Sequence, residues 1–247
     1  MGNKIIDINC DVGEGIGNEA DLFPMISSCN IACGGHAGAK ESISQSIELA
    51  LKFNVRVGAH PSYPDRENFG RVSMNISDAD LIESIRNQLK LFMTECNEMG
   101  ATLHHIKPHG ALYNDIAKNE RLANVFLSAI LPYKDNVILY VPYGSVIESL
   151  AKANDFNIMK EAFADRNYNN DLSLVSRKQD QALISNGEEV LEHLVLMYKE
   201  NQVRTVTGKK IPIQADTFCI HGDTPSAFQI LTYITKHLPE HNLQAKP

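Results

Sequence analysis

His105, Lys107 and His109 form the densest group of chemically capable residues, within the segment HHIKPHGALY at residues 104–113. In an extended strand, side chains two positions apart lie on the same face, so these three are expected to point the same way. A lysine beside two histidines at a semi-buried mouth polarises a carbonyl, holds a carboxylate or phosphate, or shifts proton affinities. A single histidine is more often structural, but this combination at a strand end favours a function.

A second polar series, Asp7, Asn9 and Asp11, alternates with apolar residues near the start of the chain. The same spacing places all three on one face of a strand, where buried polar groups are costly unless paired or hydrogen-bonded. An EF-hand calcium loop is excluded because its sixth position would be Val12 instead of glycine. A purely structural polar network remains an alternative to a functional one.

Polar residues also follow most of the other apolar runs, and Arg71 lies in a loop at residues 62–73 that is long enough to act as a lid. The glycines before His36 could equally serve a tight turn, Asp165 and Arg166 could form a surface ion pair, and Asp223 could be only a helix-end acid. The further candidates at these ends are Asn30, His36, His60, Glu161, Asp165, Arg166, His221 and Asp223.

Seven apolar runs that alternate with amphipathic segments must position these residues. Such an alternation predicts a parallel β/α architecture, either a barrel or a doubly wound sheet. Both place their sites at the carboxyl ends of the strands. The predicted strands are residues 4–10, 29–33, 55–59, 102–107, 137–141, 158–163 and 215–220.

Helix signals lie between the runs. One helix is expected from a cap at Ser77 to Gly100, and the last helix is expected to start at Thr224-Pro225. Its buried stripe would contain Phe228, Leu231, Ile234 and Leu238, and a further helix is marked by Ile43, Ile47, Ala50 and Leu51. Residues 203–206 and 211–214 are expected to form a hairpin.

Composition excludes several classes of protein. The 247 residues are 43% hydrophobic and 21% charged, which is typical of a globular chain, here taken as one domain over residues 1–247. The net charge of -7 gives no electrostatic basis for binding nucleic acid or an anionic membrane. Five cysteines without a Cys-x-x-Cys pair indicate neither a disulfide framework nor a zinc ribbon, and the expected location is the reducing cytoplasm. The sequence contains neither a Walker P-loop nor a nucleophile elbow. Together with the polar strand ends, this favours hydrolysis of a small polar substrate by acid/base or electrophilic catalysis.

The strand ends, taken in order, resemble the LamB/YcsF family, and the resemblance extends from residue 6 to residue 223. It implies a seven-stranded parallel β/α barrel, TIM-barrel-like and of the glycoside hydrolase/deacetylase type. It also implies ATP-dependent opening of the lactam 5-oxoproline to glutamate, with ATP as cosubstrate and two partner subunits, B and C. The matching segments are IDINCDVGEG, NIACGGHAG, VGAHPSYPD, FGR, KPHGALYN, EAFADRNY and CIHGD.

Lactam opening needs an activated carbonyl, a positioned water and a proton for the leaving nitrogen. Under the resemblance, Lys107, His109 and Arg166 would bind carboxylate or phosphate. Asp11 or Asp165 would activate water, and His60 or His221 would carry the proton. The residues expected to contact the substrate are Asp7, Asn9, Asn30, His36, Arg71, Glu161, Arg166 and Asp223.

Two alternatives stay open. The first is a metal-dependent deacetylase in which Asp11, His36 and His60 hold a divalent metal, although the second strand is not followed by a His-x-x-x-His pair. The second is a non-catalytic subunit that presents the substrate to partners.

Overall fold

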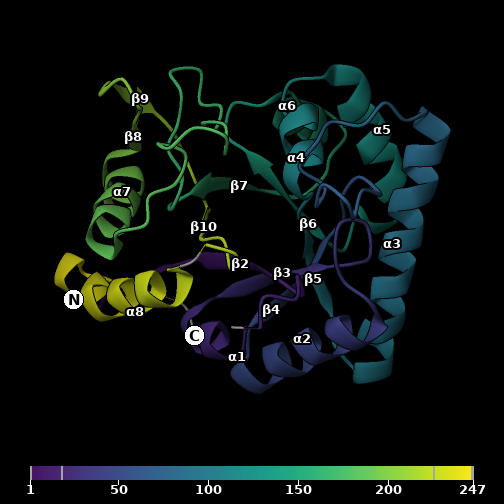
Figure 1. Ribbon diagram of the computed structural model, residues 1–247, viewed down its shortest axis with the longest axis horizontal. Coiled ribbons are helices and arrows are strands. Elements are labelled where there is room, and N and C mark those ends of the chain that lie inside the picture. The colour runs from purple at the N-terminus through teal and green to yellow at the C-terminus, as the bar shows by residue number, and fades with distance from the viewer. Residues whose placement is uncertain (1, 18, 225, 246–247) are drawn as a thin grey trace.

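Seven parallel strands close into a barrel in the computed structural model, which describes residues 2–17, 19–224 and 226–245 (Figure 1). Each strand pairs with the next along the chain, and β10 closes the ring between β7 and β2. The prediction of seven strands is confirmed, and the closed barrel decides against the doubly wound sheet. The strands are β2 (Ile8–Val12), β3 (Ser28–Ala32), β4 (Arg56–His60), β5 (Leu103–Ile106), β6 (Ile138–Pro142), β7 (Ile158–Phe163) and β10 (Thr217–Cys219).

The first predicted strand, residues 4–10, is wrong in its bounds because the chain forms two strands there. β1 (Lys4–Ile6) pairs in parallel with β11 (Leu243–Ala245) in a small sheet outside the barrel. The chain then leaves that sheet at Asp7 and enters the barrel as β2.

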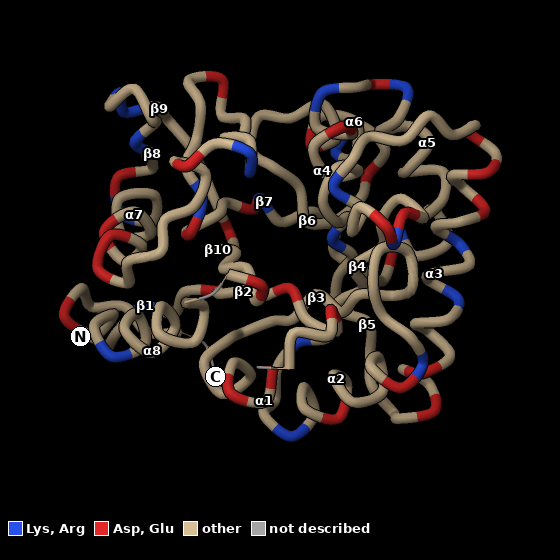
Figure 2. Tube along the Cα trace, in the orientation of Figure 1, with Lys and Arg blue, Asp and Glu red and all other residues tan. Residues whose placement is uncertain are grey.

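Helices surround the barrel, and along α3 basic residues in the middle are flanked by acidic residues toward both ends (Figure 2). Within the described residues no helix combines the length and the apolar character that a membrane span needs. The predicted hairpin is confirmed, formed by β8 (Gln202–Arg204) and β9 (Lys210–Pro212). The α-helices are α1 (Glu19–Leu22), α2 (Lys40–Phe53), α3 (Asp78–Met99), α4 (Gly110–Ile116), α5 (Glu120–Ile130), α6 (Val146–Ala153), α7 (Gly187–Glu200) and α8 (Ala227–His237). The 3-10 helices are η1 (Phe23–Met25), η2 (Leu131–Tyr133) and η3 (Leu238–His241).

The ends of α3 are where the sequence places them. The hydroxyl of Ser77 accepts a hydrogen bond from the backbone N–H of Asp80, which satisfies one of the free donors of the first turn. Gly100 follows the last turn with a φ of 68°, a left-handed conformation that glycine adopts without strain.

The start of α8 differs from the prediction. The helix begins at Ala227 after Ser226, and the hydroxyl of Thr224 donates to Asp165 instead of capping the helix. Pro225 lies outside the described residues.

One residue assigned to a buried helical stripe, Phe228, is 44% exposed. With about 100° between successive residues, it lies roughly a quarter turn from the middle of the stripe. The prediction is therefore wrong for Phe228, while Leu231, Ile234 and Leu238 are buried. The helix marked by Ile43, Ile47, Ala50 and Leu51 is confirmed as α2.

The middle of the barrel is filled by polar and aromatic side chains. The ring of His105 stacks on Tyr140 with centroids 4.0 Å apart, and its Nε2 lies 2.7 Å from Oδ1 of Asn30. The amide of Asn30 in turn donates to Oδ1 of Asn9 at 2.8 Å. His105 fits because position 58 is glycine: a Cβ there would overlap the Nε2, Cε1 and Cδ2 atoms of the ring.

We predict that Gly58→Ala lowers the free energy of unfolding by about 1–3 kcal/mol, because the methyl group overpacks a filled interior. Urea denaturation of the purified protein measures the change. Gly2→Ala is the matched control, since a Cβ at position 2 meets no atom within 4 Å. Equal unfolding midpoints for the two variants would show that the ring can move aside.

Candidate active site

A buried lysine lies between two carboxylates at the carboxyl end of the barrel. Nζ of Lys107 is 2.9 Å from Oδ1 of Asp11 and 2.9 Å from Oε1 of Glu161, and all three residues are at most 5% exposed. Nζ also lies 3.0 Å from Sγ of Cys219 and 3.3 Å from Oδ1 of Asn9. Burial alone would lower the pKa of Lys107, but Asp11, Cys219 and Glu161 hold that pKa well above its ordinary value. The side chain is therefore an ammonium ion, held in a fixed position at the carboxyl end of the barrel.

A histidine–aspartate pair lies at the ends of β10 and β7. Nδ1 of His221 is 2.9 Å from Oδ1 of Asp165, whose other oxygen accepts the backbone N–H of His221 at 2.9 Å and the hydroxyl of Thr224 at 3.0 Å. Burial would raise the pKa of Asp165, but His221 and these hydrogen bonds lower it to about 2. Because the carboxylate is ionised, it holds the proton of His221 on Nδ1, which leaves Nε2 as the atom able to exchange protons.

Above these groups lies a cavity of about 510 Å³ whose charged lining is mainly cationic. Asp223 fixes two of the arginines: it pairs with Arg71, and its two carboxylate oxygens lie 3.2 and 3.3 Å from the guanidinium of Arg177. Asp11 contributes the carboxylate of the lining, and the cationic residues are Arg71, Lys107, Lys118, Arg166, Arg177 and Lys178.

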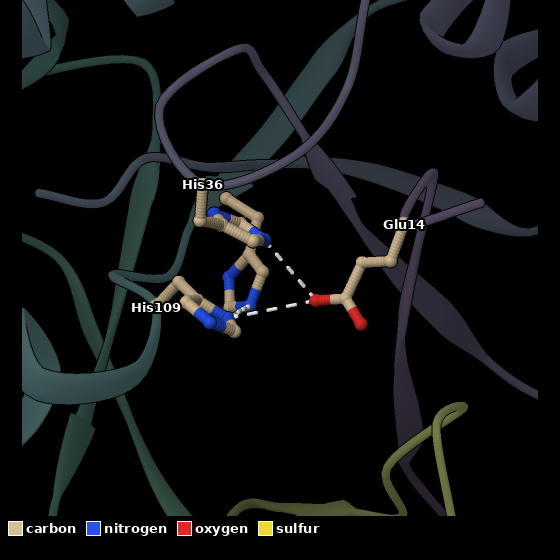
Figure 3. Close-up of side chains that lie close together, drawn as sticks. Glu14, His36 and His109 are labelled. Carbon is tan, nitrogen blue, oxygen red and sulfur yellow. Dashed lines mark hydrogen bonds and ion pairs between the residues drawn. The ribbon is translucent and has the colours of Figure 1, made fainter. Parts of the chain in front are cut away.

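Three histidines and a glutamate converge beside this cavity, and two of them, His60 and His109, line it. Oε1 of Glu14 lies 3.2 Å from Nε2 of His36 and 3.5 Å from Nδ1 of His109, and the two rings stack with centroids 3.6 Å apart (Figure 3). Nδ1 of His109 is also 2.9 Å from Nε2 of His60. Burial lowers the pKa of His36 to about 2 and the pKa of His109 well below its ordinary value. One nitrogen or oxygen from each of these four residues lies within 4.8 Å of all the others, so the group could hold a metal ion.

Asp11, Cys219 and His221 form a second group with the spacing of metal ligands. Here the ammonium of Lys107 already contacts Oδ1 of Asp11 and Sγ of Cys219. Because the ammonium of Lys107 lies where a metal ion would bind, this group is suited to acid/base chemistry and not to metal binding.

The structure brings nearly all the predicted site residues to one end of the barrel. Some line the cavity, some lie directly behind those residues, and two lie one layer deeper in the barrel. The cavity residues are Asp11, His60, Arg71, Lys107, His109, Arg166 and His221; those behind them are His36, Glu161, Asp165 and Asp223; the deeper pair is Asn9 and Asn30.

Asp7 is not brought to the mouth. Its carboxylate pairs with Arg56 and accepts hydrogen bonds from Ser28 and Thr217. Each of these three partners is the first residue of its strand: Arg56 of β4, Ser28 of β3 and Thr217 of β10. Asp7 shares the interior face with Asn9, since both side chains hydrogen-bond to the hydroxyl of Thr217. It lies at the amino end of the barrel because it precedes Asp11 by four residues, each of which advances a strand by about 3.3 Å.

Arg166 lines the cavity, yet much of its guanidinium is already engaged. Nη2 donates to the carbonyl of Val175 at 2.6 Å and Nε to that of Ala182 at 3.1 Å. The side chain thus holds the long segment after β7 against the barrel.

Sequence reasoning missed Glu14 and Arg177. Glu14 follows the first polar strand directly, so its place at the carboxyl end was a usable signal. Arg177 lies in an irregular segment whose path no periodicity predicts, and only its contact with Asp223 identifies it.

Comparison with known proteins gives consistent matches over nearly the full length. The sequence profile described as "LamB/YcsF family" matches residues 6–247. The chain is 37% identical over 241 residues to the A component of the 5-oxoprolinase of Haemophilus influenzae, with 98% of each chain covered. It is 40% identical over 233 residues to the corresponding component from Bacillus cereus, with 92% of each covered. The crystal structure of a lactam utilization protein from Thermus thermophilus is similar with a TM-score of 0.90 and 30% identity, covering 98% of this chain and 99% of that one.

We predict that Lys107→Met lowers the free energy of unfolding by about 3–5 kcal/mol, because it leaves the buried carboxylates of Asp11 and Glu161 without a counter-charge. Urea denaturation at pH 7 measures the loss. Adding Asp11→Asn and Glu161→Gln to the same chain should recover most of the stability, since the uncompensated charges are then gone. A single variant as stable as the wild type would show that the ammonium is not needed to hold the carboxylates.

Proposed function

Because the chain belongs to the LamB/YcsF family, we propose that it acts as the A component of an ATP-dependent 5-oxoprolinase. In this role it opens the lactam of 5-oxo-L-proline to L-glutamate, with ATP as cosubstrate and with two partner subunits, B and C. The observation that carries the proposal is the match, over 98% of both chains, to a protein named as the A component of 5-oxoprolinase. A reducing, cytoplasmic location fits this role and the five free, buried cysteines.

The charge of the cavity supports an anionic substrate. 5-Oxoproline carries a carboxylate, and phosphorylation of its lactam oxygen would add further negative charge. Arg71 and Arg177 are held at the rim by Asp223, and the ammonium of Lys107 lies below them. We assign the substrate carboxylate to the arginines and the activated lactam oxygen to Lys107, since a fixed cation stabilises charge that develops there.

The two polar centres divide the remaining chemistry. A water oxygen adds to the carbon of the phosphorylated lactam, the C–N bond breaks, and the nitrogen leaves with a proton. The acyl phosphate that results is cleaved by a second water molecule to glutamate and inorganic phosphate. Asp11, whose pKa is lowered by the neighbouring His60 and Lys107 despite burial, accepts a proton from the attacking water. His221 supplies the proton from Nε2, while Asp165 positions the ring through Nδ1. Asp165 is thus a positioning residue and not the group that activates water.

We place the nucleotide step on the partners. An unstrained lactam is a stabilised amide, and transfer of phosphate from ATP to its oxygen would make the carbon more electrophilic. The sequence has no Walker P-loop, so a division of labour accounts for an ATP-dependent reaction that uses this chain.

Reconstitution tests the proposal directly. Glutamate release from 5-oxoproline is followed with this chain, its two partner subunits and ATP, and with each component left out. We predict turnover only in the full mixture. ATP-dependent lactam opening by the chain alone would refute the division of labour, and a full mixture without glutamate release would refute the proposed reaction.

For His221→Asn we predict a decrease in kcat of the reconstituted complex of about a hundredfold to ten-thousandfold, the usual contribution of a positioned proton donor. The asparagine amide keeps a donor for Asp165, so the unfolding midpoint should change little. The matched control is His237→Asn, because His237 pairs with Glu240 at the end of α8, outside the cavity. Unchanged kcat in His221→Asn would favour a subunit that only presents the substrate.

A further inference from the structure

The cluster of Glu14, His36, His60 and His109 contains a close contact between nitrogens of His60 and His109 that two neutral rings cannot make as a hydrogen bond. Nδ1 of His60 lies 2.7 Å from the carbonyl oxygen of Lys107, and Nε2 of His109 lies 3.0 Å from the carbonyl oxygen of Phe69. Since a carbonyl oxygen only accepts hydrogen bonds, each of these nitrogens carries the proton of its ring. The other nitrogens, Nε2 of His60 and Nδ1 of His109, therefore present lone pairs to each other at 2.9 Å.

Carboxylates surround the same point. Oε1 of Glu14 is 3.5 Å from Nδ1 of His109, and Oδ2 of Asp11 is 3.4 Å from Nε2 of His60. These atoms all carry lone pairs, and the residues are buried or nearly so. Such a convergence of lone pairs around a point favours a cation at its centre.

We propose that this cation is a divalent metal ion, with zinc as the best fit, held by Glu14, His36, His60 and His109. Three imidazoles and one carboxylate form a ligand set that zinc prefers. With bonds of about 2.1 Å, neighbouring ligands of a tetrahedral zinc lie about 3.4 Å apart. The three contacts that link these ligand atoms measure 2.9, 3.2 and 3.5 Å, so only small shifts are needed.

The surroundings have the form of a metal site. Metal-binding histidines usually donate their second nitrogen to a carbonyl or carboxylate, which fixes the ring and its tautomer. His60 and His109 do so through the carbonyls of Lys107 and Phe69. Figure 3 shows the carboxylate of Glu14 facing the rings of His36 and His109 across the site.

Each ligand follows a different strand of one side of the barrel. Glu14 comes after β2, His36 after β3, His60 ends β4 and His109 follows β5. These four strands are consecutive in the sheet, so the site is built into the fold and does not depend on a mobile loop. His60 and His109 also line the large cavity, which places the ion on its wall beside Asp11.

Metal binding is tested on the isolated chain, without partners, ATP or lactam, so its outcome is independent of the proposed function. The protein is stripped with EDTA, returned to chelator-free buffer and titrated with Zn²⁺ against a chromophoric chelator. We expect one zinc per chain, and an increase in the unfolding temperature on zinc addition.

Glu14→Gln and His36→Asn should each weaken zinc binding by at least about a hundredfold, more than the usual loss of an outer-shell partner. They should also abolish the zinc-dependent rise in unfolding temperature. His237→Gln is the control and should bind as the wild type does. If His36→Asn does not fold, Glu14→Gln alone decides. Equal zinc affinity in Glu14→Gln and the wild type, or no zinc uptake by the wild type, would overturn the proposal and identify the cation as a proton shared by His60 and His109.

Discussion

The ammonium of Lys107, enclosed by the carboxylates of Asp11 and Glu161, is the interaction on which the rest of the site depends. Its three members come from the end of β5, from β2 and from β7, so the charges connect separate parts of the ring of strands. An ion pair this deep is stable only while every partner is in place. The amide of Asn30, which donates to Asp11 at 2.8 Å, extends the same network into the barrel interior. The floor of the cavity is thus rigid for electrostatic reasons.

The local charge of the mouth is opposite to that of the whole molecule. The chain carries a net charge of -7, yet this cavity collects arginines and lysines around the carboxylate of Asp11. The net negative charge argues against long polyanions as partners. It does not argue against a small anion, because a cleft lined by positive charges concentrates the electrostatic field inside it. Asp223 has a structural part in this arrangement, since it keeps Arg71 and Arg177 at the rim.

Much of the site could be predicted from strand periodicity, as Asn9 with Asp11 and Lys107 with His109 show. The rule does not bring Asp7 to the mouth, because periodicity gives the face on which a side chain lies and not its height along the barrel. It also fails for Phe228, which is apolar but lies at the edge of its helical stripe. Contacts between distant loops, such as that of Arg177 with Asp223, depend on the path of the chain in space, which no local pattern records.

Closure of the barrel has a consequence for synthesis of the protein. β10 lies between β2 and β7, and its pairing with β2 joins segments about two hundred residues apart along the chain. During synthesis on the ribosome, β2 and β7 can form and pack against helices before β10 is made. Until then each has one edge whose backbone N–H and C=O groups are unpaired. Open strand edges are sites of intermolecular pairing, and contacts this distant form slowly. Synthesis of β10 is therefore the step that converts a half-closed sheet, which is prone to association, into a closed barrel.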